Sequence, residues 1–304
     1  MYFGLYHQKY KFDEQKERLL YILDKADLST LQPYVLYLLK KYQSKEQESI
    51  LNERLNDLEK FVVRRLLTGK SNKNYNKDCK SFIAEESYVK EMANEISNEE
   101  ILVGINHIDN RAATIALFWI ELYRRKSELK DENKLEDKYT LEHVMPQQWH
   151  EYWLDVPVKD IDDTVINDVV NAEIQRTKYI YSIGNMTLLT GRFNTSLRNY
   201  TFKRKMEGED GKPGVIECSS LSITTRDIVE EVYKDTKKTW DEYQILLREQ
   251  KLGKEIIEIW GQKDGINKID IQKATSYVPK EEDLIKIHDT QCINCKNFKS
   301  KICS

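Results

Sequence analysis

Glycine and proline are both scarce in this sequence, with 11 and 5 residues among 304. Because these two residues interrupt helices most strongly, a chain poor in them is predicted to be rich in helix. The sequence also lacks any apolar run close to the roughly 18 residues that a membrane-spanning helix needs. With 40% hydrophobic and 33% charged residues, the chain has the composition of a polar globular protein, and we predict no membrane partner.

An excess of positive charge is missing as well, since 48 Lys and Arg residues face 51 Asp and Glu residues and the net charge is -3. Binding of nucleic acid through an overall positive field is thereby excluded, and any such contact needs a local basic surface. Residues 1–7 lack the basic and apolar segments of a signal peptide, from which we expect a cytoplasmic protein. The five cysteines are odd in number and unevenly spread, which argues against a disulfide framework.

Apolar periodicity predicts a helical region in the first half of the chain. The segments with this pattern are residues 12–43 as two helices, residues 46–68 ending at Gly69, and residues 109–129. Ser97 and Glu100 have the spacing of a capping box, which marks the start of a further helix. Residues 126–138 are charged without periodicity, so we place a boundary there and predict a helical domain over residues 1–135.

The pattern changes at Tyr139. Two segments are predicted to be strands, residues 139–144 and residues 183–190, and the second is entered through a Gly-Asn turn. Helices are predicted near residues 164–178, over residues 191–200, and over residues 224–250 with a continuation to Trp260. The sequence thus predicts a mostly helical α+β protein with a second domain over residues 136–250 and a mixed tail over residues 251–304.

Polar side chains suited to phosphodiester hydrolysis follow one another in the second domain: Glu142 with His143, Gly184 with Asn185, and Asn194. A neutral imidazole such as that of His143 has a suitable pKa to take a proton from water. A carboxylate and an amide oxygen, as in Glu142 and Asn194, form a hard ligand set that suits Mg²⁺. Adjacent strand residues point to opposite faces, so Glu142 and His143 can serve one site only if the strand ends or bends there, as Pro146 allows.

Several stretches of this domain resemble the C-terminal HNH (His-Me finger) nuclease domain of GmrSD-type modification-dependent restriction endonucleases. They are Glu-His-Val-Met-Pro-Gln at 142–147, Gly-Asn-Met-Thr-Leu-Leu-Thr at 184–190, Phe-Asn-Thr-Ser-Leu-Arg-Asn at 193–199, and Phe202 with Lys205. The HNH domain of CRISPR RNA-guided nucleases is similar in the order of its elements. The likeness covers residues 139–206 and extends more weakly to residues 61–67 and 109–121. It implies a ββα-metal (HNH) nuclease domain over residues 136–250, preceded by the helical domain.

The resemblance also implies a role for individual residues. His143 matches the general base that activates water, and Glu142 matches the acidic metal ligand. Asn185 matches the residue that ties the two strands together by bonding backbone, and Asn194 matches the second metal ligand on the following helix. A single divalent ion, Mg²⁺ or Mn²⁺, is the implied cofactor, and DNA is the implied substrate.

Whole enzymes of this family usually carry an N-terminal nucleotide-hydrolysing domain that reads the modified DNA. This sequence contains no G-x-x-x-x-G-K-[ST] loop and is too short to hold such a domain. We therefore expect either a separate effector subunit or a piece of a longer enzyme. In either case target recognition would belong to an NTPase partner or to a missing N-terminal domain.

Local positive charge is concentrated just after the second predicted strand. Fourteen residues, 192–205, contain five cations and no Asp or Glu. The cations are Arg192, Arg198, Lys203, Arg204 and Lys205. Their place beside Asn194 predicts contacts with DNA phosphates, and a solvated helix face is the less favoured alternative.

Histidine and cysteine side chains cluster in the tail, at His288, Cys292, Cys295 and Cys303. Such a set could hold Zn²⁺ tetrahedrally. The spacings match no standard zinc finger, so disordered or unliganded thiols remain the alternative. Elsewhere, His107 lies in a predicted helical region and is expected to be structural, and His150 matches no motif.

The sequence as a whole predicts a metal-dependent endonuclease that cuts double-stranded DNA in bacterial defence, modified phage DNA in particular. One alternative is a non-catalytic subunit that binds DNA or docks a partner on an HNH scaffold. The intact set of Glu142, His143, Asn185 and Asn194 speaks against it. Another alternative is an HNH nuclease with RNA as substrate, for which no aromatic RNA-binding signature is present.

Overall fold

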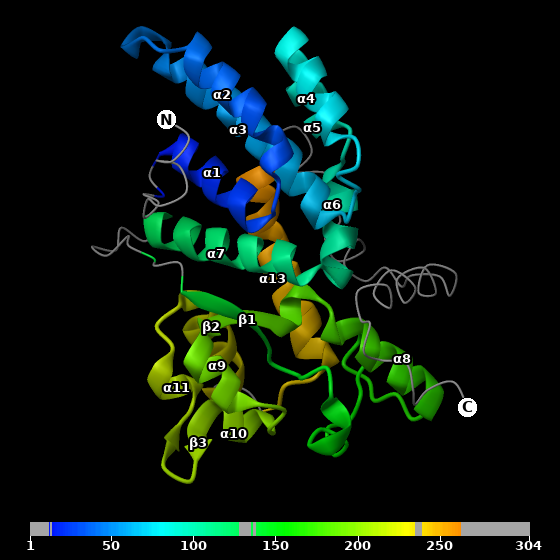
Figure 1. Ribbon diagram of the computed structural model, residues 1–304. Helices are drawn as coiled ribbons and strands as arrows, with labels where there is room; N and C mark the ends of the chain where they lie inside the picture. Colours follow the sequence, from blue (N-terminus) through cyan, green and yellow to red (C-terminus); the bar gives the residue numbers. More distant parts are fainter. Residues whose placement is uncertain (1–11, 13, 128–134, 136–137, 235–238, 263–304) are drawn as a thin grey trace, which may run out of the picture.

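The computed structural model describes residues 12, 14–127, 135, 138–234 and 239–262. In this part of the chain helices predominate and the strands are few and short (Figure 1), in agreement with a mostly helical α+β protein. None of the described helices is both long and apolar enough to cross a membrane.

The tail residues of the predicted zinc site lie outside the described residues, as does most of the charged boundary segment. The site in question comprises His288, Cys292, Cys295 and Cys303. Zinc binding there stays a prediction from the sequence.

The N-terminal half consists of helices around one apolar core. They are α1 (Gln15–Lys25), η2 (Ser29–Leu31), α2 (Gln32–Lys41), η3 (Lys45–Gln47), α3 (Glu48–Leu67), α4 (Tyr75–Ala84), α5 (Ser87–Asn94), α6 (Asn98–Gly104), η4 (Ile105–His107) and α7 (Asn110–Ser127). The predicted capping box is confirmed at the start of α6, where the Glu100 amide donates to Ser97 Oγ over 3.1 Å. Phe118 and Trp119 of α7 are buried and belong to the core, as their helical spacing predicts.

Two short strands form an antiparallel ribbon beneath α7 (Figure 1). Strand β1 (Tyr139–His143) pairs with β2 (Met186–Thr190), and Glu142 lies opposite Thr187 in this register. Because side chains alternate along a strand, one face of the ribbon packs against the N-terminal core. The other face contributes Leu189 to a second apolar cluster. The ribbon therefore lies between two cores, and its end near His143 lies at the border of both.

The second cluster is built from the elements that surround the ribbon. They are η5 (Trp149–Glu151), α8 (Val169–Ile180), η6 (Ile183–Asn185), α9 (Gly191–Leu197), α10 (Phe202–Glu207), β3 (Gly208–Glu209), β4 (Lys212–Pro213), α11 (Val215–Cys218), α12 (Ser222–Thr224), η7 (Thr225–Lys234) and α13 (Glu242–Trp260). Helix α9 follows β2 directly and contacts both strands. The chain thus forms a β-ribbon followed by a helix at the position where the sequence predicts the site.

The single helix predicted over residues 224–250 and on to Trp260 is wrong. The chain instead forms the π-helical segment η7, leaves it, and starts again with α13, whose first turn is capped by the side chain of Asp241. The break turns Trp240 into the second cluster, where its side chain is fully buried. Residues 234–239, Lys-Asp-Thr-Lys-Lys-Thr, contain no apolar side chain, and this interruption of the periodicity was the signal in the sequence for a break.

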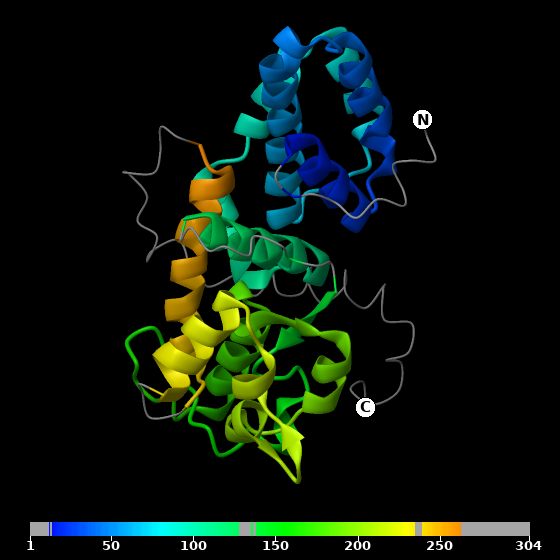
Figure 2. The same ribbon diagram turned by 90° about the vertical axis from the view of Figure 1, so that its left-hand side faces the viewer.

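Helix α13 joins the two cores, as Figures 1 and 2 show for its course through the molecule. Ile245 and Leu246 near its start belong to the second cluster, while Leu252 and Trp260 belong to the N-terminal core. The predicted limit at residue 250 falls inside this helix. The division into three domains stays a prediction.

Candidate functional site

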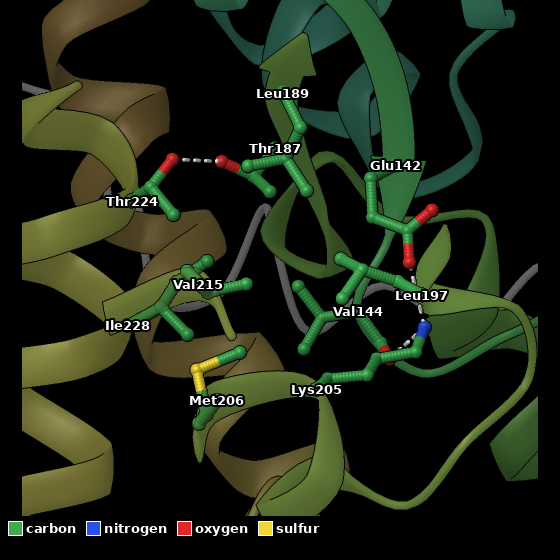
Figure 3. Close-up of a pocket in the computed structure, with 10 residues that line it drawn as sticks. All are labelled: Glu142, Val144, Thr187, Leu189, Leu197, Lys205, Met206, Val215, Thr224 and Ile228. Carbon is green, nitrogen blue, oxygen red and sulfur yellow. Dashed lines mark hydrogen bonds and ion pairs between the residues drawn. The ribbon is translucent and has the colours of Figure 1, made fainter. Parts of the chain in front are cut away.

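The end of β1 carries the two residues that the sequence assigns to the centre of the site. Glu142 and His143 are consecutive, so their side chains leave the strand on opposite faces. The Glu142 carboxylate faces the second cluster, where its Oε1 accepts a bond of 2.6 Å from Lys205 Nζ (Figure 3). The His143 ring lies instead near Tyr181, with 6.4 Å between the ring centroids. Strand β1 ends at His143, but the contacts described for the two side chains lie on different faces, so one shared site stays a prediction.

The His143 imidazole has an atom that the fold leaves without a partner. Nε2 is buried and has no hydrogen bond. Burial, together with the nearby charge of Lys205, lowers the pKa of His143 to about 4, so the ring is neutral near pH 7. Other buried side-chain atoms in the described part of the chain share this property, Trp119 Nε1 and Tyr179 Oη among them, and a catalytic role is one of its physical explanations. The ring is therefore in the state that a proton acceptor needs.

Asn185 holds the two strand ends together from the centre of the structure. Its side chain is fully buried, and its Oδ1 accepts from the Met145 amide over 2.8 Å. Its Nδ2 donates to the carbonyls of Met145 and Ile180, over 2.8 and 3.1 Å. Trp240 Nε1 adds a further bond of 3.0 Å to Oδ1. These bonds to backbone are the ones that the resemblance implies for Asn185, whose part in catalysis stays a prediction.

Replacing Asn185 by Ala is expected to lower the free energy of unfolding by at least about 3 kcal/mol, because several buried donors and acceptors lose their partners. Urea unfolding measures the change. Asn199→Ala is the matched control, since Asn199 makes an exposed bond of 3.3 Å to Gln148, and a change within about 0.5 kcal/mol is expected for it. Similar losses in the two variants would contradict the structural role of Asn185.

The turn that contains Asn185, η6, packs against α13. Gly184 lies so close to α13 that an added Cβ would lie 2.1 Å from the Ile245 carbonyl oxygen. The buried Arg248 guanidinium donates to the carbonyls of Gly184 and Met186, over 2.7 Å each. Glu249 accepts a bond from the Ser182 hydroxyl, one residue before the turn η6. The strand end is thus fixed by a helix that also belongs to the N-terminal core.

Burial raises the pKa of Glu249 to about 8, so this carboxyl stays protonated in the folded chain well above its unfolded pKa of about 4.5. Between these two values the unfolded state binds fewer protons than the native state, so the contribution to stability is lost as the pH rises. Relative to Glu249→Gln, the wild type is expected to lose on the order of 3 kcal/mol between about pH 5 and about pH 8. Thermal or urea unfolding of both proteins across this range measures it, and a constant difference would refute the protonated carboxyl.

Asn194 lies on α9, against the edge of β1. Its Nδ2 donates to the Leu141 carbonyl over 2.8 Å and to Thr140 Oγ1 over 3.0 Å. The amide nitrogen is thereby used on the strand, and Oδ1 is the end of the side chain that remains for another ligand. Thr140 and Glu142 alternate onto the same face of β1, so Asn194 and Glu142 belong to one side of the ribbon.

Of the five predicted phosphate contacts, Arg192, Arg198 and Lys203 are exposed. Arg204 is half-buried, lies over the Tyr200 ring at 3.5 Å, and forms an ion pair of 2.7 Å with Glu209. This carboxylate belongs to the hairpin of β3 and β4. Residues 192–205 contain no acid themselves, but an acid of the hairpin lies beside them in the folded chain.

Lys205 requires a correction. Its side chain is only 1% exposed, and its ammonium is bonded to Glu142, so a phosphate cannot reach it in this structure. The helix spacing explains the difference. Phe202, Lys205 and Met206 lie on one face of α10, and all three are buried against the second cluster. That spacing was the signal in the sequence that could have identified Lys205 as a buried residue.

A cavity of about 10 Å³ lies beside the Glu142–Lys205 pair (Figure 3), room for about one water molecule. A larger hollow of about 430 Å³ lies near the basic stretch, between Tyr152, Tyr200 and the start of the β3–β4 hairpin. Within the described residues, no group of three or more His, Cys, Asp or Glu side chains could hold a metal ion.

With this geometry established, comparison with known protein families gives one match, to the family described as GmrSD restriction endonucleases, C-terminal domain. The match covers residues 92–255, which is more than half of the chain. The chain belongs to this family. No match was found among curated proteins or among solved structures. The family places the chain among relatives of restriction endonucleases, with DNA as the substrate class that this relation implies.

The GmrSD match begins well before β1 and ends inside α13. It therefore includes α7, the ribbon, α9, α10 and the first part of α13, the elements that hold the residues described above. Sequence reasoning missed Trp240 and Arg248, which fix the turn at Asn185. Neither has a local signal, because each acts on residues more than fifty positions away along the chain.

Proposed function

We propose that this GmrSD C-terminal domain is a metal-dependent DNA endonuclease of the ββα-metal (HNH) type, the effector of a modification-dependent restriction system. The observation that carries the proposal is the His143 imidazole, whose buried Nε2 has no partner, at the end of a strand beside Glu142. A neutral imidazole in this state is suited to accept a proton from water. The ribbon of β1 and β2 followed by α9 supports the ββα assignment.

The donor set near β1 fits a hard divalent cation. Oε2 of Glu142 has no partner within the described part of the chain, and Oδ1 of Asn194 accepts no bond there. Mg²⁺ keeps several waters and takes few protein ligands, so one carboxylate and one amide oxygen suffice for it. We propose that Glu142 and Asn194 hold Mg²⁺ or Mn²⁺. When bound, the ion would neutralise charge on the scissile phosphate and on the departing 3′ oxygen.

His143 Nε2 is buried in the free protein, so the proposed mechanism requires the end of β1 to open to water when DNA binds. His143 Nε2 then accepts the proton of a water molecule that attacks phosphorus in line with the leaving oxygen. The pKa of His143, about 4 in the free protein, lies below the range that is optimal for a general base. An incoming phosphate brings negative charge to the imidazole and thereby raises this pKa. Asn185 keeps the backbone of residues 144–145 in place, so the imidazole retains its direction when DNA binds.

DNA would approach from the side of α9 and α10, where the three exposed cations lie. Arg192, Arg198 and Lys203 are suited to phosphate contacts, which give affinity and orientation without reading sequence. The choice of modified target is proposed to lie with a nucleotide-hydrolysing partner or domain.

A side-by-side digest tests the proposal. Supercoiled plasmid and RNA are incubated with the chain in Mg²⁺ or Mn²⁺ and, in parallel, with EDTA. Nicked or linear plasmid is expected only with the metal, and a metal-dependent rise in the unfolding temperature is expected without DNA. DNA retention with neither cleavage nor a thermal shift would instead support a non-catalytic subunit, and preferential RNA cleavage would contradict the DNA assignment.

A further inference from the structure

The ammonium of Lys205 is enclosed at the centre of the proposed site. Its three hydrogens match three acceptors: Oε1 of Glu142 at 2.6 Å, and the carbonyl oxygens of His143 and Val144 at 3.0 Å each. Burying a charge is costly unless it is paired and hydrogen-bonded, and both conditions are met here. The group is therefore held in one position, which an exposed lysine never is.

The helix that carries Lys205 is itself anchored. Phe202, one turn earlier, packs edge-on against Tyr233 and lies near Trp240, the residue that also bonds Asn185. Thr201 caps the first turn of α10 through a bond from the Arg204 amide. The Lys205 ammonium thus reaches β1 from a helix that is packed into the second cluster (Figure 3).

The acceptors of Lys205 are the groups whose direction matters most for the proposed reaction. One is the carboxylate proposed to bind the metal, and the others are the first two carbonyls from His143 onward. Asn185 bonds the next residue, Met145, through both its amide and its carbonyl. Residues 142–145 are therefore held by bonds from both Lys205 and Asn185.

We propose that Lys205 is a positioning residue of the site. It fixes one oxygen of Glu142 and the backbone that carries His143, so the second carboxylate oxygen and the imidazole keep their directions before metal or DNA arrives. The inference rests on the proposed function. It replaces the phosphate contact that the sequence predicts for this lysine, and it differs from a purely structural ion pair in what it does to metal binding.

Lys205→Met removes the ammonium and keeps the length of the side chain. Partners of metal ligands typically contribute about 10- to 100-fold to metal affinity or activity. We therefore expect kcat for plasmid nicking to fall by about this factor, with KM for DNA within about twofold, and Mn²⁺ binding without DNA to weaken about tenfold. Calorimetric or spin-resonance titration with Mn²⁺ measures the binding.

Two lysine variants bracket this result. Lys203→Met changes an exposed lysine of the same helix, with 76% of its side chain accessible, and should raise KM and reduce the salt dependence of binding by about one charge. Lys212→Met, on the exposed strand β4, should change neither kcat nor Mn²⁺ binding. The positioning role is overturned if Lys205→Met only raises KM, as expected for Lys203→Met. It is also overturned if Lys205→Met leaves kcat and Mn²⁺ binding unchanged, as expected for Lys212→Met.

Lys205→Gln serves if the Met variant does not fold. Its amide keeps two donors for the same acceptors without the charge, so losses smaller than those of Met are expected. Plasmid nicking and Mn²⁺ binding by the wild type test the proposed function. The Mn²⁺ affinity and kcat of the variant relative to the wild type test the positioning role of Lys205. Mn²⁺ binding by a wild type that leaves DNA intact would refute the nuclease, while tenfold weaker binding in the variant would still support the positioning role. No Mn²⁺ binding by the wild type overturns both.

Discussion

His143→Ala is expected to lower the rate of DNA cleavage by about 10²- to 10⁴-fold, the usual contribution of a general base. The residue lies at the end of β1, and its Nε2 is buried without a partner, so the fold gains no hydrogen bond from that atom. Stability should therefore change little, and Mn²⁺ binding should persist, because Glu142 and Asn194 are untouched. Single-turnover nicking of plasmid at saturating Mg²⁺ measures the rate.

His150→Ala is the matched control for this prediction. His150 is exposed, stacks on Trp149 with 3.8 Å between the ring centroids, and approaches Glu173, neither of which is among the residues proposed for the site. The rate of this variant should equal that of the wild type. If His143→Ala cuts at the wild-type rate, or loses activity only because it unfolds, His143 is not the base.

Glu142→Gln is expected to lower cleavage by about 10²- to 10³-fold, because a catalytic metal supplies several kcal/mol of charge stabilisation. The amide keeps the shape of the side chain and an oxygen for Lys205, but it is a much weaker ligand for Mg²⁺. Mn²⁺ titration should show weaker binding in the variant, and higher metal concentrations should restore part of the rate.

Loss of a charge beside a buried lysine complicates this variant, since Lys205 is then left without its counter-ion. The double variant Glu142→Gln with Lys205→Met removes both charges. It should regain most of the stability that the single variant loses, while cleavage stays low. Recovery of cleavage together with stability would show that Glu142 acts only as a structural partner of Lys205.

Local patterns were sufficient to predict the parts of the site that depend on neighbours in sequence. Residues 139–144 and 183–190 have the composition of strands, and the structure forms β1 and β2 within them. The Gly-Asn turn before β2 is also present, as η6. The predicted contacts of Asn185 with backbone follow from this pairing, because the register brings residues 143 and 186 together.

The remaining features depend on residues that meet only in the folded chain. The basic stretch beside Asn194 predicts that Lys205 contacts DNA phosphate, but the helix face that it shares with Phe202 and Met206 is buried. Arg204 pairs with Glu209 at the start of the β3–β4 hairpin, an acid that a count of charges ending at residue 205 leaves out. Trp240 is not part of a helix, and its indole nitrogen donates a buried hydrogen bond to Asn185.

Metal-dependent nicking of supercoiled plasmid by the purified chain tests the central claim most directly. We expect conversion of supercoiled to nicked plasmid by the wild type in Mg²⁺ or Mn²⁺, none in EDTA, and a rate lower by about 10²-fold or more in His143→Ala under the same conditions. Modified and unmodified plasmids are compared in parallel, since the choice between them is proposed to lie with another domain or partner. Equal nicking by the wild type and His143→Ala, or no metal-dependent product on either DNA, would contradict it.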